Sequence, residues 1–246
     1  MERVTVYGEI ATAKTLATLI SSIPNCAGGP AQICICDIHS LANQFYFSDN
    51  VLIRLETCIP LLLYQLERMK EEKKTAETPN ADICVAFPDD GAQKRFGSLF
   101  KNFDQIICIK KRDGDTRNTV IKEGNSKNKH IVIVDDLVQS GGTLVTCGYL
   151  LKKEGALSVS CYCTHAVFPQ DSWKRFTAGG QDENLFEHFF ITDTIPLRAQ
   201  LLKNYKPFQV LSIVYTFLPV IGGWLFFFFL QRGRKVVMDF VHLNRC

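Results

Sequence analysis

The chain has 246 residues and is 46% hydrophobic, so it is long and apolar enough to form one large or two small domains with a buried core. Its 28 Lys and Arg residues against 25 Asp and Glu residues leave a formal net charge of +3. A balance this close to neutral argues against a polyanionic partner such as nucleic acid.

The ten cysteines form no C-x-x-C pair, which predicts free thiols in a reducing, cytoplasmic compartment. Four of them alternate within apolar, strand-like runs, at Cys34, Cys36, Cys161 and Cys163. A four-thiolate metal site is one interpretation, but structural zinc sites take their ligands from turns with wider spacings. We therefore expect buried thiols that pack as small hydrophobes. No targeting signal is readable at the N-terminus.

In the first third of the chain, the sequence predicts two helices with one short strand between them. Apolar residues recur with helical spacing from Glu9 to Ile23, and Val51 to Met69 also reads mostly as helix, with Pro60 near its start. Between them, Gln32 to Cys36 reads as a short strand. The polar segment from Lys70 to Asn80 reads as a surface loop.

The rest of the chain alternates strands and helices, which predicts an α/β fold with a parallel sheet. Lys110 to Lys129 is charged and lacks periodicity, so we expect a mobile active-site loop there. The predicted strands are Ile83–Phe87, Gln105–Ile109, Ile131–Val134, Val159–Thr164, Leu185–Thr192 and Val210–Val214, and the predicted helices are Ala92–Phe103 and Leu144–Lys153.

The stretch HIVIVDDLVQSGGT, from His130 to Thr143, carries the most specific chemistry. An acid pair, Asp135 and Asp136, follows a buried strand, and a loop from Gln139 to Thr143 runs into an apolar helix. Glycines let backbone N–H groups close around a phosphate at a helix start. The acids suit sugar hydroxyls or a metal, so the pattern predicts a phosphorylated sugar as ligand. The alternative for the acids is a helix N-cap with a solvated neighbour.

This pattern resembles the phosphoribosyl pyrophosphate (PRPP) motif of type I phosphoribosyltransferases and ribose-phosphate pyrophosphokinases. Further segments match the second family: Asp37-Ile38-His39, the diphosphate loop from Phe87 to Arg95, the K-x-R pattern Lys110-Lys111-Arg112, and the strand end from Thr164 to Phe168. The resemblance runs from about Glu2 to Ser212 and is greatest to the divergent plant-type members.

The resemblance implies two type I phosphoribosyltransferase-like domains with parallel sheets. Glu2 to Lys14 aligns with the segment after the family's early ATP loop, so the first domain is expected to be truncated. The expected division is a partial N-terminal domain at 1–56, a C-terminal domain with the PRPP motif at 57–212, and an apolar tail at 213–246.

The implied activity is ribose-phosphate diphosphokinase, which converts ATP and ribose 5-phosphate into PRPP and AMP for nucleotide biosynthesis. The resemblance implies catalytic roles for Lys110 and Arg112, and Mg²⁺ ligation by His39 and Asp89. Mg²⁺ prefers oxygen, so Asp89 is the better ligand on first principles. Ribose 5-phosphate would be bound by Asp135, Asp136, Gln139, Ser140, Gly141, Gly142 and Thr143. ATP or its diphosphate would be bound by Glu2, Arg3, Asp90, Gly91, Lys94 and Arg95.

Two other functions stay open. A phosphoribosyltransferase would use PRPP rather than make it, but the Asp37–His39 segment and the K-x-R pattern argue against it. A catalytically silent homologue could regulate or scaffold full-length synthetases, and the expected truncation supports it. As an enzyme, the chain is expected to form homo-oligomers or oligomers with full-length homologues.

Ile213 to Leu230 is almost continuously apolar and is followed by basic residues. Its length suits a membrane span, and a replaced core helix or an altered transcript end are the alternatives. The basic flank favours the cytoplasmic side, so membrane association through 213–230 would be a shallow hairpin that turns at Pro219 to Gly223.

Overall fold

The computed structural model describes residues 12–25, 27–75, 82–113 and 116–214. Two sheets are present in this part of the chain, one of two strands and one of seven. Glu2 and Arg3 lie outside the described residues, as does the predicted apolar tail beyond Val214. Within the described residues, no helix has the length and apolar character needed to cross a membrane.

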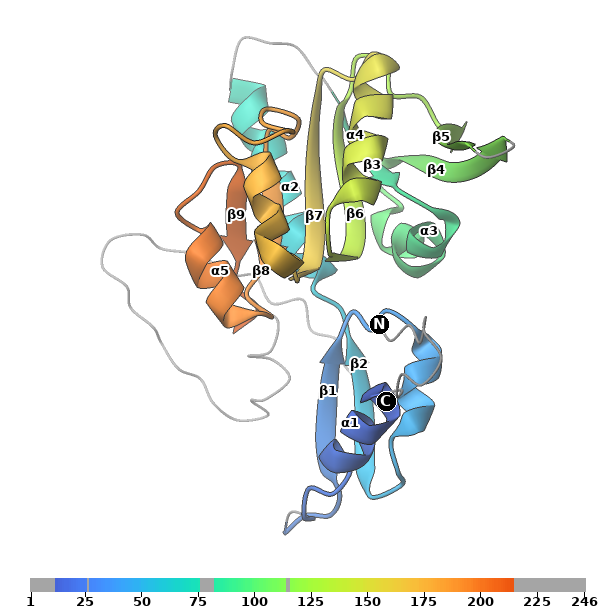
Figure 1. The fold of residues 1–246 in the computed structure, drawn as a ribbon, viewed down its shortest axis with the longest axis vertical. Helices are drawn as coiled ribbons and strands as arrows, with labels where there is room; N and C mark the ends of the chain where they lie inside the picture. The colour runs from blue at the N-terminus through green and yellow to red at the C-terminus, as the bar shows by residue number, and fades with distance from the viewer. Residues whose placement is uncertain (1–11, 26, 76–81, 114–115, 215–246) are drawn as a thin grey trace.

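The larger sheet has the strand order β5-β4-β3-β6-β7-β8-β9 and is parallel except at β5, which runs antiparallel to β4. It confirms the predicted α/β class, and the strand of the PRPP motif, β6, lies at its centre (Figure 1). Its strands are β3 (Ile83–Phe87), β4 (Asp104–Asp113), β5 (Thr116–Glu123), β6 (His130–Val138), β7 (Ser158–Ala166), β8 (Phe189–Thr192) and β9 (Phe208–Leu211).

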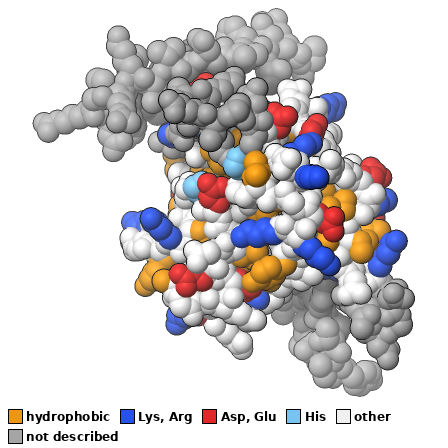
Figure 2. All heavy atoms as spheres, turned by 90° about the horizontal axis from the view of Figure 1, so that it is seen from above, with side chains coloured by type: hydrophobic (Ala, Val, Ile, Leu, Met, Phe, Trp, Pro, Cys, Tyr) orange, Lys and Arg blue, Asp and Glu red, His pale blue; other side chains and the backbone are white. Residues whose placement is uncertain are grey.

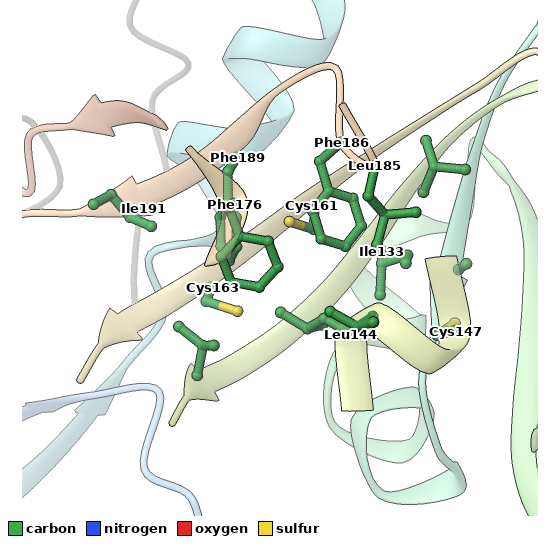
Figure 3. Close-up of a cluster of buried hydrophobic side chains, with 14 of the residues drawn as sticks. Ile133, Leu144, Cys147, Cys161, Cys163, Phe176, Leu185, Phe186, Phe189 and Ile191 are labelled. Carbon is green, nitrogen blue, oxygen red and sulfur yellow. The ribbon is translucent and has the colours of Figure 1, made fainter. Parts of the chain in front are cut away.

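Helices cover both faces of this sheet, which is why most residues of its central strands are buried whichever face they point to. The helices α2 (Ile59–Thr75) and α3 (Asp90–Phe96) pack on one face, where alternate residues such as Val132 and Val134 of β6 are buried. The helix α4 (Gly142–Lys153) packs on the other face with the 3-10 segment η3 (Pro169–Phe176), against Ile131 and Ile133. Figure 3 shows this second core, with α4 and the phenylalanines around Cys161 and Cys163. A last helix, α5 (Pro196–Leu202), lies beside β9.

The smaller sheet pairs β1 (Ala31–Cys36) with β2 (Val51–Glu56) in parallel, and α1 (Thr12–Ile20) and the 3-10 segment η1 (Leu41–Tyr46) accompany it. The prediction that Val51 to Met69 is mostly helix was therefore wrong at its start, where six residues hydrogen-bond along β1. The helix begins only at Ile59, with Pro60 in its first turn, where its missing N–H is tolerated. The predicted domain boundary at 56/57 falls between β2 and α2 and stays a prediction.

The segment from Lys110 to Lys129 has more regular structure than the loop predicted for it, and its mobility stays a prediction. Most of the segment forms an antiparallel hairpin of β4 and β5, in which Arg112 pairs with Arg117. The hairpin projects from the edge of the larger sheet (Figure 1). Much of it is exposed, so its sequence lacks the apolar alternation that marks a half-buried strand.

Smaller differences follow from packing. The predicted helix Ala92–Phe103 is α3 followed by the 3-10 segment η2 (Gly97–Phe100), and the predicted strand Leu185–Thr192 begins only at Phe189. Leu185 and Phe186 instead pack on Gly148 of α4, where a Cβ atom would lie 3.0 Å from Phe186 Cε1.

The thiols divide between the two sheets. Cys161 and Cys163 are fully buried in β7, as predicted, whereas Cys34 is exposed and Cys36 half-buried at the small sheet. No group of three potential metal ligands comes together among the described residues, so the four-thiolate site is not formed there. Basic and acidic side chains are interspersed on the face seen in Figure 2, in keeping with the small net charge.

Candidate active site

The predicted site residues gather at one edge of the larger sheet. The parallel strands β3, β4, β6 and β7 all end there, and each contributes a site segment at or just after its carboxyl end. The carboxyl ends of β1 and β2 point toward the same edge (Figure 1). Such an edge is where ligands bind in open α/β sheets.

The loop from Gln139 to Gly141 connects β6 to α4, and the first N–H group of the helix, that of Gly142, makes only a long contact of 3.5 Å with Ser140 Oγ. Gly141 precedes the helix with a φ of +79°, a left-handed conformation that favours glycine. A Cβ atom there would also lie 2.6 Å from Phe176 Cζ. At Gly142, by contrast, the nearest atom is Ser140 Oγ at 3.7 Å. The loop therefore has the shape of an anion site at a twelve-residue helix.

Two side chains that the sequence analysis did not predict donate hydrogen bonds to backbone carbonyls of this loop. Arg175 Nη1 donates to the Ser140 carbonyl at 3.0 Å, and Ser172 Oγ donates to the Gln139 carbonyl at 3.0 Å. Arg175 Nε also donates at 2.5 Å to Asp182, whose side chain is only 2% exposed. No local pattern marks Arg175, because it lies in a 3-10 segment whose role depends on contact with a distant loop.

The acid pair lies in β6, so the alternative of a helix N-cap is wrong. Asp136 is almost fully buried and receives hydrogen bonds from His39 Nδ1, at 2.6 Å, and from Arg95 Nη1. Burial alone would raise the pKa of Asp136, but Arg95 and His39 outweigh burial and hold that pKa below its usual range. Burial raises the pKa of Asp135 to about 8, and the charge of Asp136 adds to the effect. The pKa of Asp136 thus lies below, and the pKa of Asp135 above, the usual range of an aspartate.

Arg95 makes contacts that the sequence analysis did not predict. Besides Asp136, it donates through Nη2 to the His39 carbonyl at 2.8 Å, so it connects α3 to the segment after β1. Asp89 caps α3 by accepting from the Ala92 N–H at 2.9 Å. Asp90 forms an exposed ion pair with Lys122 at 3.0 Å. The contacts of Arg95 and His39 bring α3 and the segment after β1 to the PRPP motif, whereas Asp89 and Asp90 contact Ala92 and Lys122 outside it.

The remaining predicted residues lie on the same side. Lys110 Nζ donates to Thr143 Oγ1 at 3.1 Å, so the first cation of the K-x-R pattern reaches the phosphate loop directly. Arg112 follows on β4, but its side chain lies outside the described part of the structure. Lys94 is exposed in the last turn of α3, and Gly91 lies beside Asp89, whose Oδ1 would be 3.1 Å from an added Cβ.

The donor atoms of Asp89 and His39 do not form a complete metal site by themselves. They suit a divalent cation that binds together with substrate phosphates. Asp89 is exposed, and its Oδ1 is the atom that caps the helix. His39 Nδ1 faces Asp136, and 35% of the His39 side chain is exposed. Mg²⁺ commonly takes one or two protein carboxylates and completes its shell with water and substrate phosphates. Asp89 and His39 fit such an ion in part, and substrate oxygens would complete its shell.

The fold and loop define a phosphoribosyltransferase-like α/β domain, and the family model of the phosphoribosyl transferase domain matches residues 68–178. Ribose-phosphate pyrophosphokinase 4 of Oryza sativa subsp. japonica is 50% identical over 217 residues, which are 86% of this chain and 63% of the relative. Ribose-phosphate pyrophosphokinase 3, mitochondrial, of Spinacia oleracea is 47% identical over 216 residues, which are 86% of this chain and 51% of the relative.

A crystal structure of phosphoribosylpyrophosphate synthetase from Mycobacterium smegmatis superposes with a TM-score of 0.63, over 87% of this chain and 63% of that chain. At 22% identity, this likeness supports the fold alone. The chain belongs to the ribose-phosphate pyrophosphokinase family, and its relatives in plants confirm the predicted plant type. It spans between 51% and 63% of the length of the two plant relatives.

Proposed function

We propose that this chain carries the ribose 5-phosphate site and the diphosphate-transfer site of a ribose-phosphate diphosphokinase. The reaction is ATP plus ribose 5-phosphate to PRPP plus AMP. The observation that carries the proposal is the contact of Lys110 Nζ with Thr143 Oγ1, because it places a cation of the hairpin directly over a phosphate-binding helix start. A sugar phosphate bound by the loop would present its other end to the acid pair of the same strand.

The 5-phosphate binds to the backbone N–H groups at the start of α4 and to the hydroxyls of Ser140 and Thr143, with Gln139 at the entrance of the loop. The ribose hydroxyls bind at the acid pair. A protonated Asp135 can both donate and accept there, whereas the ionised Asp136 only accepts. The two carboxyl groups together can therefore match a pair of vicinal hydroxyls, each of which is donor and acceptor.

In the transfer step, the C1 hydroxyl oxygen of ribose bonds to the β-phosphorus of ATP, and the bond from that phosphorus to the AMP oxygen breaks. Lys110 and Arg112 would stabilise the charge on the transferring group, since preorganised cations act most strongly where charge develops. Lys94, Asp90 and Gly91 line the approach of the diphosphate. Glu2 and Arg3 are proposed nucleotide contacts that lie outside the described residues.

Mg²⁺ is the proposed cofactor, and when bound it would supply positive charge that neutralises phosphate oxygens. Asp89 is the proposed carboxylate ligand and His39 a proposed contact, direct or through water. Oligomerisation with copies of this chain or with full-length homologues is proposed from the resemblance. The cytoplasm is proposed as the compartment from the free thiols, although the spinach relative is named as mitochondrial.

A catalytically silent, regulatory or scaffolding homologue is the second candidate. It is favoured by the internal contacts of Arg95, His39 and Asp89, because side chains that would bind nucleotide or metal are engaged with protein groups. Such a chain would keep the sugar phosphate site and lack turnover.

The test combines calorimetric binding of ribose 5-phosphate with an assay of AMP release from ATP, ribose 5-phosphate and Mg²⁺. We expect Lys110→Ala to lower kcat on the order of a hundredfold and to change KM much less. Lys129→Ala is the matched control, because Lys129 pairs with Asp104 at the opposite edge of the sheet. Binding without AMP release would favour the silent homologue, and absence of ribose 5-phosphate binding would refute the proposal.

A further inference from the structure

The segment from Cys36 to His39 holds a central part of the proposed site, although it belongs to the small sheet. It carries His39, whose Nδ1 donates to the carboxylate of Asp136 across 97 residues of sequence. Asp37 within it is buried and has a φ of +40°, a left-handed conformation that is uncommon for a residue other than glycine. Such a conformation persists only where surrounding contacts impose it.

Those contacts come from the carboxyl end of β7. Thr164 Oγ1 donates to Asp37 Oδ2 at 2.6 Å, and the same carboxylate oxygen accepts from the Cys58 N–H at 3.0 Å. Thr164 is fully buried, so its hydroxyl is committed to protein partners. The next residue, His165, places its Nε2 at 3.0 Å from the Cys36 carbonyl. Two adjacent side chains of β7 thus contact the last residue of β1, Cys36, and the residue that follows it, Asp37.

The Cys36 carbonyl can only accept, so His165 Nε2 donates to it at 3.0 Å. Nδ1 lies 3.0 Å from Thr194 Oγ1, which also donates to the Thr164 carbonyl at 2.9 Å. Thr192 Oγ1 donates to the same carbonyl at 2.7 Å. Residues of β8 and its following turn therefore hold His165 in one orientation.

We propose that Thr164 and His165 are positioning residues that hold the segment 36–39 in place, so that His39 lies against Asp136 at the acid pair. The proposal rests on the proposed function and deepens it. Among the described residues, neither side chain contacts a predicted ligand group directly, so both act through the segment 36–39. Their effect should therefore fall on transfer and on the binding of nucleotide with its cation, whereas the ribose 5-phosphate loop is held separately by Arg175 and Ser172.

Thr164→Val tests this with little change of volume, because it removes only the hydroxyl. Thr164→Ser keeps the hydroxyl and should restore the contact. Ser160→Ala is the matched control, since Ser160 is also buried in β7 and its hydroxyl accepts a hydrogen bond from the His188 N–H. His165→Phe is a second, independent variant that removes the donor to Cys36.

The first readout is hydrogen exchange, which does not depend on activity. The amides of Asp37 and Cys58 donate to Glu56 and to the Asp37 carboxylate. They should exchange roughly tenfold faster or more in Thr164→Val, the ratio expected when a hydrogen bond to a charged group is lost. Thr164→Ser and Ser160→Ala should leave them near the rate of the unchanged chain. Unaltered exchange in both Thr164→Val and His165→Phe would overturn the proposal.

The second readout is turnover. Loss of an outer contact of a metal or substrate ligand typically lowers activity by about 10- to 100-fold, so kcat should fall by that factor in Thr164→Val while ribose 5-phosphate affinity stays within about twofold. Faster exchange with unaltered kcat would show a structural contact only and would also overturn the positioning role. If the unchanged chain binds no ribose 5-phosphate, the proposed function fails, and the exchange result still decides whether Thr164 and His165 hold the segment.

Discussion

Gly141→Ala should destabilise the fold, whereas Gly142→Ala, one residue later, should not. At Gly141 the φ of +79° costs a residue with a Cβ atom about 1–2 kcal/mol. The new atom would also lie 2.6 Å from Phe176 Cζ, and overpacking of this kind costs about 1–3 kcal/mol. Alanine also lowers the conformational entropy of the unfolded chain, which offsets about 0.4–1 kcal/mol of this loss of stability. The net loss of unfolding free energy is about 2–4 kcal/mol.

Phe176 has little freedom to move away from the new Cβ atom. It is 1% exposed, and its ring lies edge-on to Phe168 and Phe189, with centroid distances of 6.1 and 5.2 Å. Gly142 has no such neighbour and no positive φ, so alanine there should change the unfolding free energy by less than about 0.5 kcal/mol.

Urea unfolding of the two variants and the unchanged chain measures this difference. With a slope of about 2 kcal/mol per M, Gly141→Ala should lower the midpoint by about 1–2 M. Phe176→Leu in the Gly141→Ala background should give a combined loss smaller than the sum of the single losses, because the two sites are in contact. Equal midpoints for Gly141→Ala and Gly142→Ala would refute the reasoning.

Two further predictions concern charged groups. The pKa of Asp135 is raised to about 8, mainly by burial, so the folded chain binds a proton that the unfolded chain releases, and stability should fall as pH rises from about 4 to about 8. Asp135→Asn should remove that part of the pH dependence in unfolding experiments, and an unchanged slope would contradict the assignment. Arg175→Ala should lower the unfolding free energy by about 3 kcal/mol, because it leaves the buried Asp182 without its cation. It should also weaken ribose 5-phosphate binding, since the Ser140 carbonyl loses its donor. Lys174→Ala, at an exposed ion pair with Asp171, should cost less than about 1 kcal/mol, and a loss equal to that of Arg175→Ala would contradict the argument.

The sequence by itself determined the parts of the molecule whose signals are local. The central strand, the acid pair, the loop and α4 follow one another within 24 residues, and each has a composition that allows only one kind of element. Central strands of a parallel sheet are apolar on both faces, so they can be predicted from a short apolar run in the sequence alone. The predicted fold class and family rest on these segments, and the comparisons confirm both.

Only the tertiary structure decided what the remaining elements do. Val51–Glu56 is a strand because β1 provides its hydrogen-bonding partner. The hairpin of β4 and β5 forms at an exposed edge of the sheet, so burial imposes no alternation of apolar residues on its sequence. His39, Arg95 and Asp136 meet from three distant segments of the chain, and the contact of Arg95 with Asp136 was not predicted. Hydrogen bonds between such distant residues depend on distances in space, and residue spacing along the chain carries no record of them.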